Sequence, residues 1–371
     1  MTASPAQEPE FEIRASAAPT SAAERAQLLV APGFGVVFTD HMATIRWTER
    51  DGWHDARIER YAPLTLDPAT VVFHYAQEIF EGLKAYRQPD GSIAAFRPDA
   101  NAARFNHSAD RMAMPRLPAE LFVRSLDLLV AQDRDWVPTT DGHSLYLRPF
   151  MIGTARGFGV NHPSSSYLYS VLASPVAGYF GGEVHPVTVW ISREYSRAAP
   201  GGTGEAKCGG NYAAAFAGQQ QALDHGCDQV VWLDAAERQW VEEMGGMNIC
   251  FVYGSGADAR IVTPAATGTL LQGITRDSLL KLGPDLGIPA AEGRVSVTDW
   301  QRGCASGEIT EVFACGTAAV ITPIGTVRSA DGEWTVGDGG AGPVTTRLRE
   351  DLVGIQQGTR PDRYGWLHQM C

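Results

Sequence analysis

The chain has 371 residues, beyond the roughly 250–300 at which one hydrophobic core stops growing, so we expect two domains. With 30 Lys and Arg against 42 Asp and Glu, its net charge of −12 disfavours a nucleic-acid partner. The six cysteines form no CxxC pair, and no apolar run reaches the ~18 residues of a membrane span. We therefore expect a soluble, cytoplasmic protein with reduced thiols, no bound metal and no membrane contact.

Residues 1–28 are rich in Ala, Ser, Pro and Glu and carry no continuous apolar block. This composition predicts a mobile arm with at most a short strand at Phe11–Arg14, and no secretory signal. Residues 29–176 predict a small α+β domain, because short β-type runs separated by turns alternate with helical periodicity. The turn Pro89-Asp90-Gly91 indicates a β-hairpin. Strands are predicted at 43–47, 56–60, 83–87, 93–96, 145–150 and 167–172, and helices at 101–112 and 119–132.

Residues 177–186 predict an interdomain linker, since a proline and several glycines interrupt the strand pattern near mid-chain. The second and larger domain then covers 187–371. A helix with an apolar body is expected at 211–225, ended by Gly226 in a left-handed conformation. Strands are predicted at 187–191, 229–233, 239–242 and 248–253, and further helices at 275–282, 298–306 and 345–357.

The glycine-rich segment Pro200–Tyr212 contains Lys207 among five glycines. A phosphate-binding Walker A loop does not fit, because Ala206 and Cys208 stand where that motif needs Gly and Ser or Thr. A solvated lysine on a surface loop is the simple alternative. A helix starts immediately afterwards, however, and a desolvated lysine at such a junction favours the neutral amine that attacks a carbonyl.

Three further segments carry candidate chemistry. In Val241–Asn248, strand alternation turns either Glu242 or Glu243 inward, where a carboxylate could keep a pyridine nitrogen protonated; the alternative is a solvated pair at a strand end. The segments 271–276 and 313–319 could bind anions through backbone N–H groups, although most Gly-Thr turns bind nothing. Arg148 in an apolar strand requires a pocket or a carboxylate partner.

Seven motifs together resemble, in order and spacing, the branched-chain amino acid aminotransferases, which are pyridoxal 5′-phosphate enzymes of fold type IV. They are residues 34–42, 74–86, 144–149, 201–212, 243–248, 273–275 and 316–318. The resemblance implies a small α/β N-terminal domain and a larger C-terminal domain with a β-barrel-like sheet and helices. It also implies a homodimer that binds small-molecule amino acids and 2-oxo acids.

The same resemblance implies roles for individual residues. Lys207 would bind the cofactor covalently and act as the catalytic base, Glu243 would pair with the ring nitrogen, and Tyr212 would hydrogen-bond the phenolic oxygen. Further cofactor contacts are implied for Arg104, Arg197, Leu271, Gly273, Ile274, Thr275 and Thr317. Substrate contacts are implied for Tyr75, Thr317 and Ala318 at the α-carboxylate, Phe34, Phe80 and Tyr146 around the side chain, and Arg148 at a distal carboxylate.

The implied reaction is reversible amino transfer from leucine, isoleucine or valine to 2-oxoglutarate. Two alternatives stay open: another fold type IV activity, such as D-amino acid transamination or aminodeoxychorismate lysis, and a nucleotide- or anion-binding protein without chemistry. The sequence departs from some relatives at Ala319 and Thr322, where they carry a CxxC pair, and at Gly246, where they carry a hydroxyl residue.

Overall fold

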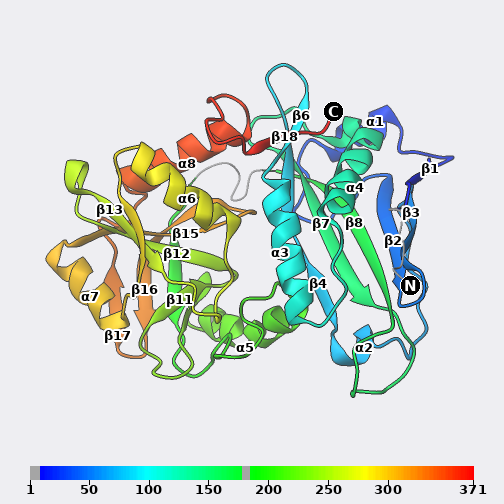
Figure 1. The fold of residues 1–371 in the computed structure, drawn as a ribbon. Coiled ribbons are helices and arrows are strands. Elements are labelled where there is room, and N and C mark those ends of the chain that lie inside the picture. Colours follow the sequence, from blue (N-terminus) through cyan, green and yellow to red (C-terminus); the bar gives the residue numbers. More distant parts are fainter. Residues whose placement is uncertain (1–8, 178–183) are drawn as a thin grey trace. The chain divides into compact units, whose positions relative to one another are not determined.

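The computed structural model describes residues 9–177 and 184–371. The chain divides into two compact units of comparable length (Figure 1). Unit 1 comprises Met1–Tyr179, Ala206–Gly209 and Gln356–Cys371, and unit 2 comprises Phe180–Glu205 and Gly210–Ile355. Residues 178–183 of the predicted linker 177–186 lie outside the described residues. Unit 1 also includes the segment around Lys207 and the C-terminal residues. The division between the units therefore does not fall at a single position in the sequence.

Unit 1 is built on a nine-stranded, mainly antiparallel sheet. Its order is β1 (Glu12–Arg14), β3 (Gly52–Arg60), β2 (His41–Thr48), β8 (Ser166–Val176), β7 (Ser144–Gly153), β5 (Leu83–Arg87), β6 (Ile93–Phe96) and β18 (Leu367–Gln369), with β4 (Glu78–Phe80) paired to β7. The hairpin predicted at residues 89–91 is confirmed: it joins antiparallel β5 and β6, and Gly91 supplies a φ of 86°.

Two long helices, α3 (Pro98–Arg111) and α4 (Ala119–Gln132), pack on the unit 1 sheet, where Phe105, Phe122 and Tyr169 meet in the core. Shorter helices are α1 (Ala22–Leu28), α2 (Val72–Tyr75) and the 3-10 helix at Arg134–Trp136. The prediction that residues 1–28 hold at most a short strand is wrong in one respect, because α1 follows β1. Ser21 caps this helix by accepting from Glu24 N at 3.2 Å, but α1 buries no residue and so has no apolar periodicity.

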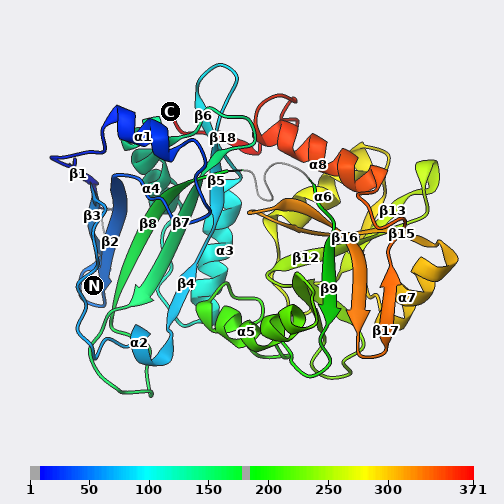
Figure 2. The ribbon, with the colours of Figure 1, turned by 180° about the vertical axis from the view of Figure 1, so that it is seen from behind.

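Unit 2 contains a closed six-stranded barrel (Figure 2). Its strands follow the order β11 (Val241–Met244), β10 (Gln229–Leu233), β9 (Val187–Ile191), β16 (Val320–Ser329), β15 (Ile309–Gly316) and β12 (Met247–Tyr253), and β12 pairs with β11 to close the ring. β13 (Arg260–Pro264) and β14 (Ala290–Gly293) extend the sheet from β12, and β17 (Gly332–Thr335) pairs with β16. Closure leaves the six barrel strands fully paired.

The helices of unit 2 are α5 (Gly209–Asp224), α6 (Ile274–Asp285), α7 (Val297–Ser306) and α8 (Pro343–Gln356), with a 3-10 helix at Gly256–Asp258. Gly226 has the predicted left-handed conformation, with a φ of 67°. The predicted helix is confirmed as α5, but two of its large apolar residues do not pack inward, because Phe216 and Leu223 are 71% and 53% exposed. The helix packs through small residues: Ala222 is fully buried, and a Cβ atom on Gly218 would lie 2.5 Å from the Trp232 ring.

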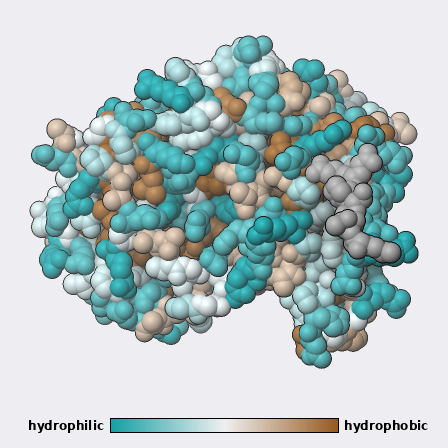
Figure 3. All heavy atoms as spheres, viewed as in Figure 1, coloured by the Kyte–Doolittle hydropathy of each residue, from teal (hydrophilic) through white to brown (hydrophobic). Residues whose placement is uncertain are grey.

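Polar residues cover much of the surface shown in Figure 3, with scattered apolar residues between them. Within the described residues, no helix has both the length and the apolar character needed to cross a membrane. The six cysteines are all free.

Candidate active site

Lys207 lies in a segment that unit 1 holds through its backbone. Its N–H donates to Ser108 Oγ of α3 at 2.9 Å, and its carbonyl accepts from Phe80 N of β4 at 3.0 Å. The neighbouring residues Ala206 and Cys208 are buried. The Lys207 Nζ atom lies 4.7 Å from the centre of the Phe80 ring. Lys207 is therefore a half-buried lysine on a fixed backbone, as expected of a reactive lysine and unlike one on a solvated loop.

A second feature of unit 1 is the buried ion pair of Glu81 and Arg104. Arg104 Nε and Nη2 each lie 2.8 Å from a carboxylate oxygen of Glu81, and Asn101 Nδ2 donates to Glu81 at 2.7 Å. Burial alone raises the pKa of Glu81, but the charge and hydrogen bonds of Arg104 outweigh burial and lower it below its ordinary value. The nearby charge of Lys207 acts in the same direction. Sequence reasoning named Arg104 but missed Glu81.

The predicted residues Phe34, Phe80, Tyr146 and Arg148 lie together in unit 1. The rings of Phe34 and Tyr146 are 5.0 Å apart in an edge-on arrangement, and the Arg148 guanidinium lies over the rings of Phe80 and Tyr146 at 4.9 and 5.3 Å. Arg148 Nη2 also donates to the Tyr146 hydroxyl at 2.9 Å. A Cβ on Gly82 would lie 2.0 Å from that hydroxyl, so glycine is required there. This cluster combines apolar surface with a positive charge.

Tyr75, the remaining substrate residue predicted in unit 1, makes different contacts. It lies in α2, is 42% exposed, and donates its hydroxyl to the carbonyl of Phe158 at 2.7 Å. These contacts tie Tyr75 to the loop that follows β7.

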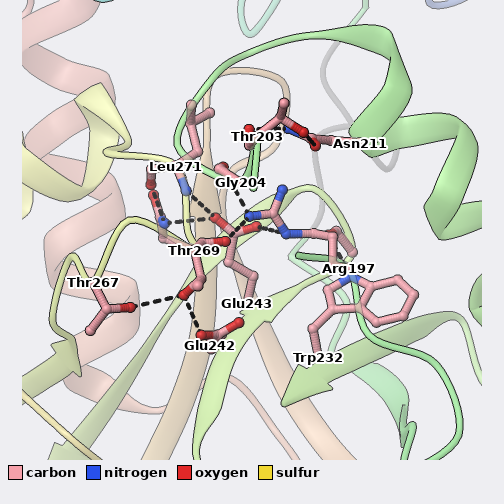
Figure 4. Close-up of polar contacts among 12 residues, drawn as sticks. Arg197, Thr203, Gly204, Asn211, Trp232, Glu242, Glu243, Thr267, Thr269 and Leu271 are labelled. Carbon is pink, nitrogen blue, oxygen red and sulfur yellow. Dashed lines mark hydrogen bonds and ion pairs between the residues drawn. The ribbon is translucent and has the colours of Figure 1, made fainter. Parts of the chain in front are cut away.

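In unit 2, the predicted carboxylate Glu243 forms a buried ion pair with Arg197 (Figure 4). Its Oε2 lies 2.8 Å from Arg197 Nε, and its Oε1 accepts from Leu271 N at 2.9 Å and from Asn248 Nδ2 at 3.4 Å. Arg197 Nη2 donates in turn to the carbonyls of Thr269 and Gly204 at 2.6 and 3.2 Å. These donors stabilise the ionised form of Glu243.

Two sequence-based expectations about this strand need revision. Glu242 and Glu243 are both buried, whereas simple alternation predicted that only one of them turns inward. β11 is covered on both faces, and Glu242 lines a cavity of about 300 Å³ outside the Glu243 cluster. Arg197 was predicted as a cofactor contact, but its pairing with Glu243 was not foreseen, because the two residues lie far apart along the chain.

Helix α6 presents its N-terminus next to the Glu243 cluster. Gly273 is the N-cap residue, and no side chain caps the helix. A Cβ on Gly273 would lie 1.9 Å from Asn248 Oδ1, so only glycine allows this close approach. The predicted residues Leu271, Gly273, Ile274 and Thr275 therefore form one continuous turn. Such a helix N-terminus favours a phosphate through its N–H groups and its dipole.

The remaining predicted residues of unit 2 lie at two tight turns. Thr317 and Ala318 lie between β15 and β16, in a turn that ends at Val320 with a φ of 62°. That value is strained for a β-branched residue, and such strain concentrates at functional sites. Tyr212 lies in the first turn of α5, and a Cβ on Gly246 would lie 3.3 Å from its ring. The small residue at position 246 leaves room for this aromatic ring.

Comparison with known proteins places this arrangement in a family. The family model described as amino-transferase class IV matches residues 78–327. The chain is 58% identical over 364 residues to a probable branched-chain-amino-acid aminotransferase of Streptomyces coelicolor, covering 98% of this chain and 99% of that one. It is 56% identical over 362 residues to the branched-chain-amino-acid aminotransferase of Mycolicibacterium smegmatis, covering 97% and 98%.

Solved structures give the same result. The branched-chain amino acid aminotransferase of Escherichia coli matches with a TM-score of 0.70 and 29% identity, covering 89% of this chain and all of that one. A branched-chain amino acid aminotransferase solved with pyridoxamine 5′-phosphate matches with a TM-score of 0.71 and 28% identity, covering 89% and 99%. The chain belongs to the class IV aminotransferases, which are enzymes of fold type IV. Within that family, these relatives are all named as branched-chain amino acid aminotransferases.

Proposed function

We propose that this chain is a transaminase that moves the amino group of L-leucine, L-isoleucine or L-valine to 2-oxoglutarate, reversibly and with pyridoxal 5′-phosphate as cofactor. The observation that carries the proposal is Lys207, a half-buried lysine whose backbone is fixed at both N–H and carbonyl, within a class IV aminotransferase fold. The high identity to branched-chain enzymes over nearly the whole chain supports the substrate class.

The donor set of the chain fits this cofactor. The cofactor needs an amine for its aldehyde, a carboxylate for its ring nitrogen and N–H donors for its phosphate. Lys207, Glu243 and the α6 N-terminus are the matching groups, and the donors around Glu243 keep its carboxylate ionised. When bound, pyridoxal 5′-phosphate withdraws electrons from the Cα atom of the amino acid. We assign Arg104, Arg197, Tyr212, Leu271, Gly273, Ile274, Thr275 and Thr317 to holding it.

The side chains of this protein then have distinct tasks. The Lys207 amine would remove the proton from the Cα atom of the amino acid and pass it to the cofactor rather than back to Cα, which requires an amine that is both fixed and basic. Phe34, Phe80 and Tyr146 surround the branched side chain of the substrate. Because Arg148 lies over two of these rings, the same pocket also accepts the distal carboxylate of glutamate or 2-oxoglutarate.

The α-carboxylate of the substrate is assigned to Tyr75 and to the turn at Thr317 and Ala318. A turn between two strands presents backbone N–H groups that bind an anion without adding charge. The strained conformation at Val320 supports this assignment, because a turn under strain is held by its surroundings in one geometry.

The test is the reaction of leucine with 2-oxoglutarate. K207A should lower turnover at least a thousandfold and remove the visible absorbance of the purified protein, because the amine both binds the cofactor and moves the proton. K281A is the matched control, since Lys281 is an exposed lysine paired with Asp277 at 3.0 Å, and it should leave both properties unchanged. Full turnover in K207A, or D-alanine as a better substrate than L-leucine, would contradict the proposal.

We further propose that the enzyme is a homodimer. Unit 1 exposes Phe73, Phe158 and Val160 by 61%, 65% and 71%, and the Phe158 ring packs on His74, the neighbour of Phe73. Exposed apolar side chains that lie together mark a subunit contact. Light scattering should give twice the chain mass of 39.9 kDa, and F158D should shift it toward the monomer. The cytoplasm is the proposed location, in keeping with six free thiols.

A further inference from the structure

Glu242 is a buried carboxylate that the proposed reaction does not use. It is adjacent to Glu243 in β11, so the two side chains leave opposite faces of the strand. Its exposed fraction is 7%, and within the described residues its Oε2 atom has no hydrogen-bond partner. Its Oε1 atom accepts from the hydroxyl of Thr269, which in turn lies 2.8 Å from the hydroxyl of Thr267.

Thr269 links Glu242 to the Glu243 cluster. Its hydroxyl contacts Glu242, while its carbonyl accepts from Arg197 Nη2 at 2.6 Å, and Arg197 Nε lies 2.8 Å from Glu243 (Figure 4). Gly204 packs closely against the same carbonyl, because a Cβ atom at this position would lie 2.3 Å from the Thr269 oxygen. The Thr269 carbonyl is therefore one of the two carbonyls that orient Arg197, together with that of Gly204.

We propose that Glu242 is a positioning residue: through the Thr269 hydroxyl it fixes one of the two carbonyls that orient Arg197, and so fixes the Glu243 carboxylate for the ring nitrogen of the cofactor. This inference rests on the proposed function. Two acidic neighbours could compete for the charge of Arg197. Burial raises the pKa of Glu242, opposed by the Thr269 hydrogen bond and the Arg197 charge. The Thr269 hydroxyl donates to Glu242, so Glu242 acts as a hydrogen-bond acceptor, while Arg197 Nε lies against Glu243.

The cavity beside Glu242 makes this role testable by chemical rescue. It has a volume of about 300 Å³ and is lined by Glu242, Thr267 and Thr269 together with apolar residues such as Trp240 and Leu270. Truncating Glu242 enlarges this space, and a formate ion is small enough to occupy the place of the lost carboxylate.

The experiment compares E242A, E242Q, T269V and the double variant E242A/T269V as holoenzymes. We call the chain of contacts from Glu242 through Thr269 and Arg197 to Glu243 the relay. Glu237 lines the same cavity but contacts Trp240 and Arg294, which are not part of the relay, so E237Q is the matched control. The measurements are the dissociation constant of pyridoxal 5′-phosphate, the visible spectrum, kcat and KM for leucine, and the thermal unfolding midpoint. Wild-type activity and the loss in K207A test the proposed function separately.

We expect E242A and T269V each to weaken cofactor binding about tenfold and to lower kcat with little change in KM, because Glu243 is assigned to the cofactor and not to the leucine side chain. The double variant should be no worse than either single variant, since both changes break one relay. E242Q retains an acceptor and should resemble the wild type, and formate should restore cofactor binding and kcat in E242A.

If E242A does not fold, the proposal is tested by comparing T269V with E242Q. Additive losses, a defect in E242Q equal to that of E242A, or E242A resembling E237Q would overturn the proposal.

Discussion

Among the described residues, each unit contains a buried carboxylate that pairs with an arginine, and these two pairs are held in different ways. In unit 1, Arg104 contacts both oxygens of Glu81, and Asn101 adds a third side-chain donor. In unit 2, Arg197 contacts one oxygen of Glu243 at 2.8 Å, and a backbone N–H and Asn248 supply the donors to the other oxygen.

The difference shows how firmly each arginine is fixed. Asn101 and Arg104 are three residues apart on α3, so one face of this helix supplies the three side-chain donors described above for Glu81. Arg197 is oriented by the carbonyls of Gly204 and Thr269, which belong to loops. We therefore expect the pair in unit 1 to contribute mainly to stability, and the pair in unit 2, whose arginine is oriented by loop carbonyls, to contribute less to stability.

The largest stability effect is expected at Glu81. E81Q leaves the Arg104 charge buried without its counter-ion, which should lower the free energy of unfolding by about 3–5 kcal/mol. Urea denaturation followed by circular dichroism measures this change. The control is E12Q, which breaks the exposed Glu12–Arg14 pair and should have no measurable effect. A loss in E81Q as small as that in E12Q would remove the distinction between the two units.

A smaller stability effect but a larger catalytic one is expected at Glu243. In E243Q, Arg197 keeps its two carbonyl acceptors and the nearby Glu242, so the free energy of unfolding should fall by about 1–3 kcal/mol. Turnover with leucine should drop at least a hundredfold, because a neutral amide cannot keep the ring nitrogen protonated. If E243Q is as unstable as E81Q, or retains full turnover, the two pairs do not differ in the proposed way.

Much of the fold was readable from the sequence where a segment carries its own signals. The bounds of β5, β6 and α4 agree with prediction, because turn residues and a regular apolar period define them. Helix α1 was missed because it buries nothing, and the exposure of Phe216 and Leu223 on α5 was not foreseen because small residues rather than these large ones meet the barrel. The barrel also needs the pairings of β9 with β16 and of β12 with β15, which lie far apart along the chain and which local patterns do not specify.

The candidate site, like the fold, could be predicted only where a local segment carries its own signal. The segments that hold Lys207 and Glu243 stood out because their composition is unusual, one rich in glycine and the other in adjacent carboxylates, and the family resemblance then favoured Glu243 over Glu242. Their partners were not found. Ser108, which anchors the Lys207 backbone, lies 99 positions away, and Thr269 contacts Glu242 across 27 positions. Partners at such separations are brought together by the tertiary fold, and no spacing within a motif encodes them.

The smallest expected effect is the pH dependence of stability at two buried carboxylates, Glu81 in unit 1 and Glu242 in unit 2. The pKa of Glu81 is lowered in the folded state, so its contribution to stability is present above the ordinary carboxyl pKa of about 4.3 and disappears as the pH falls through the lowered value. The pKa of Glu242 is raised, so its contribution is present below the ordinary value and disappears as the pH rises through the raised one. Relative to the wild type, E81Q should therefore become less stable, and E242Q more stable, as the pH rises from about 3 to about 8. Urea midpoints measured across this range give both difference curves, and slopes of the same sign would show that the pKa values of Glu81 and Glu242 are not shifted in opposite directions.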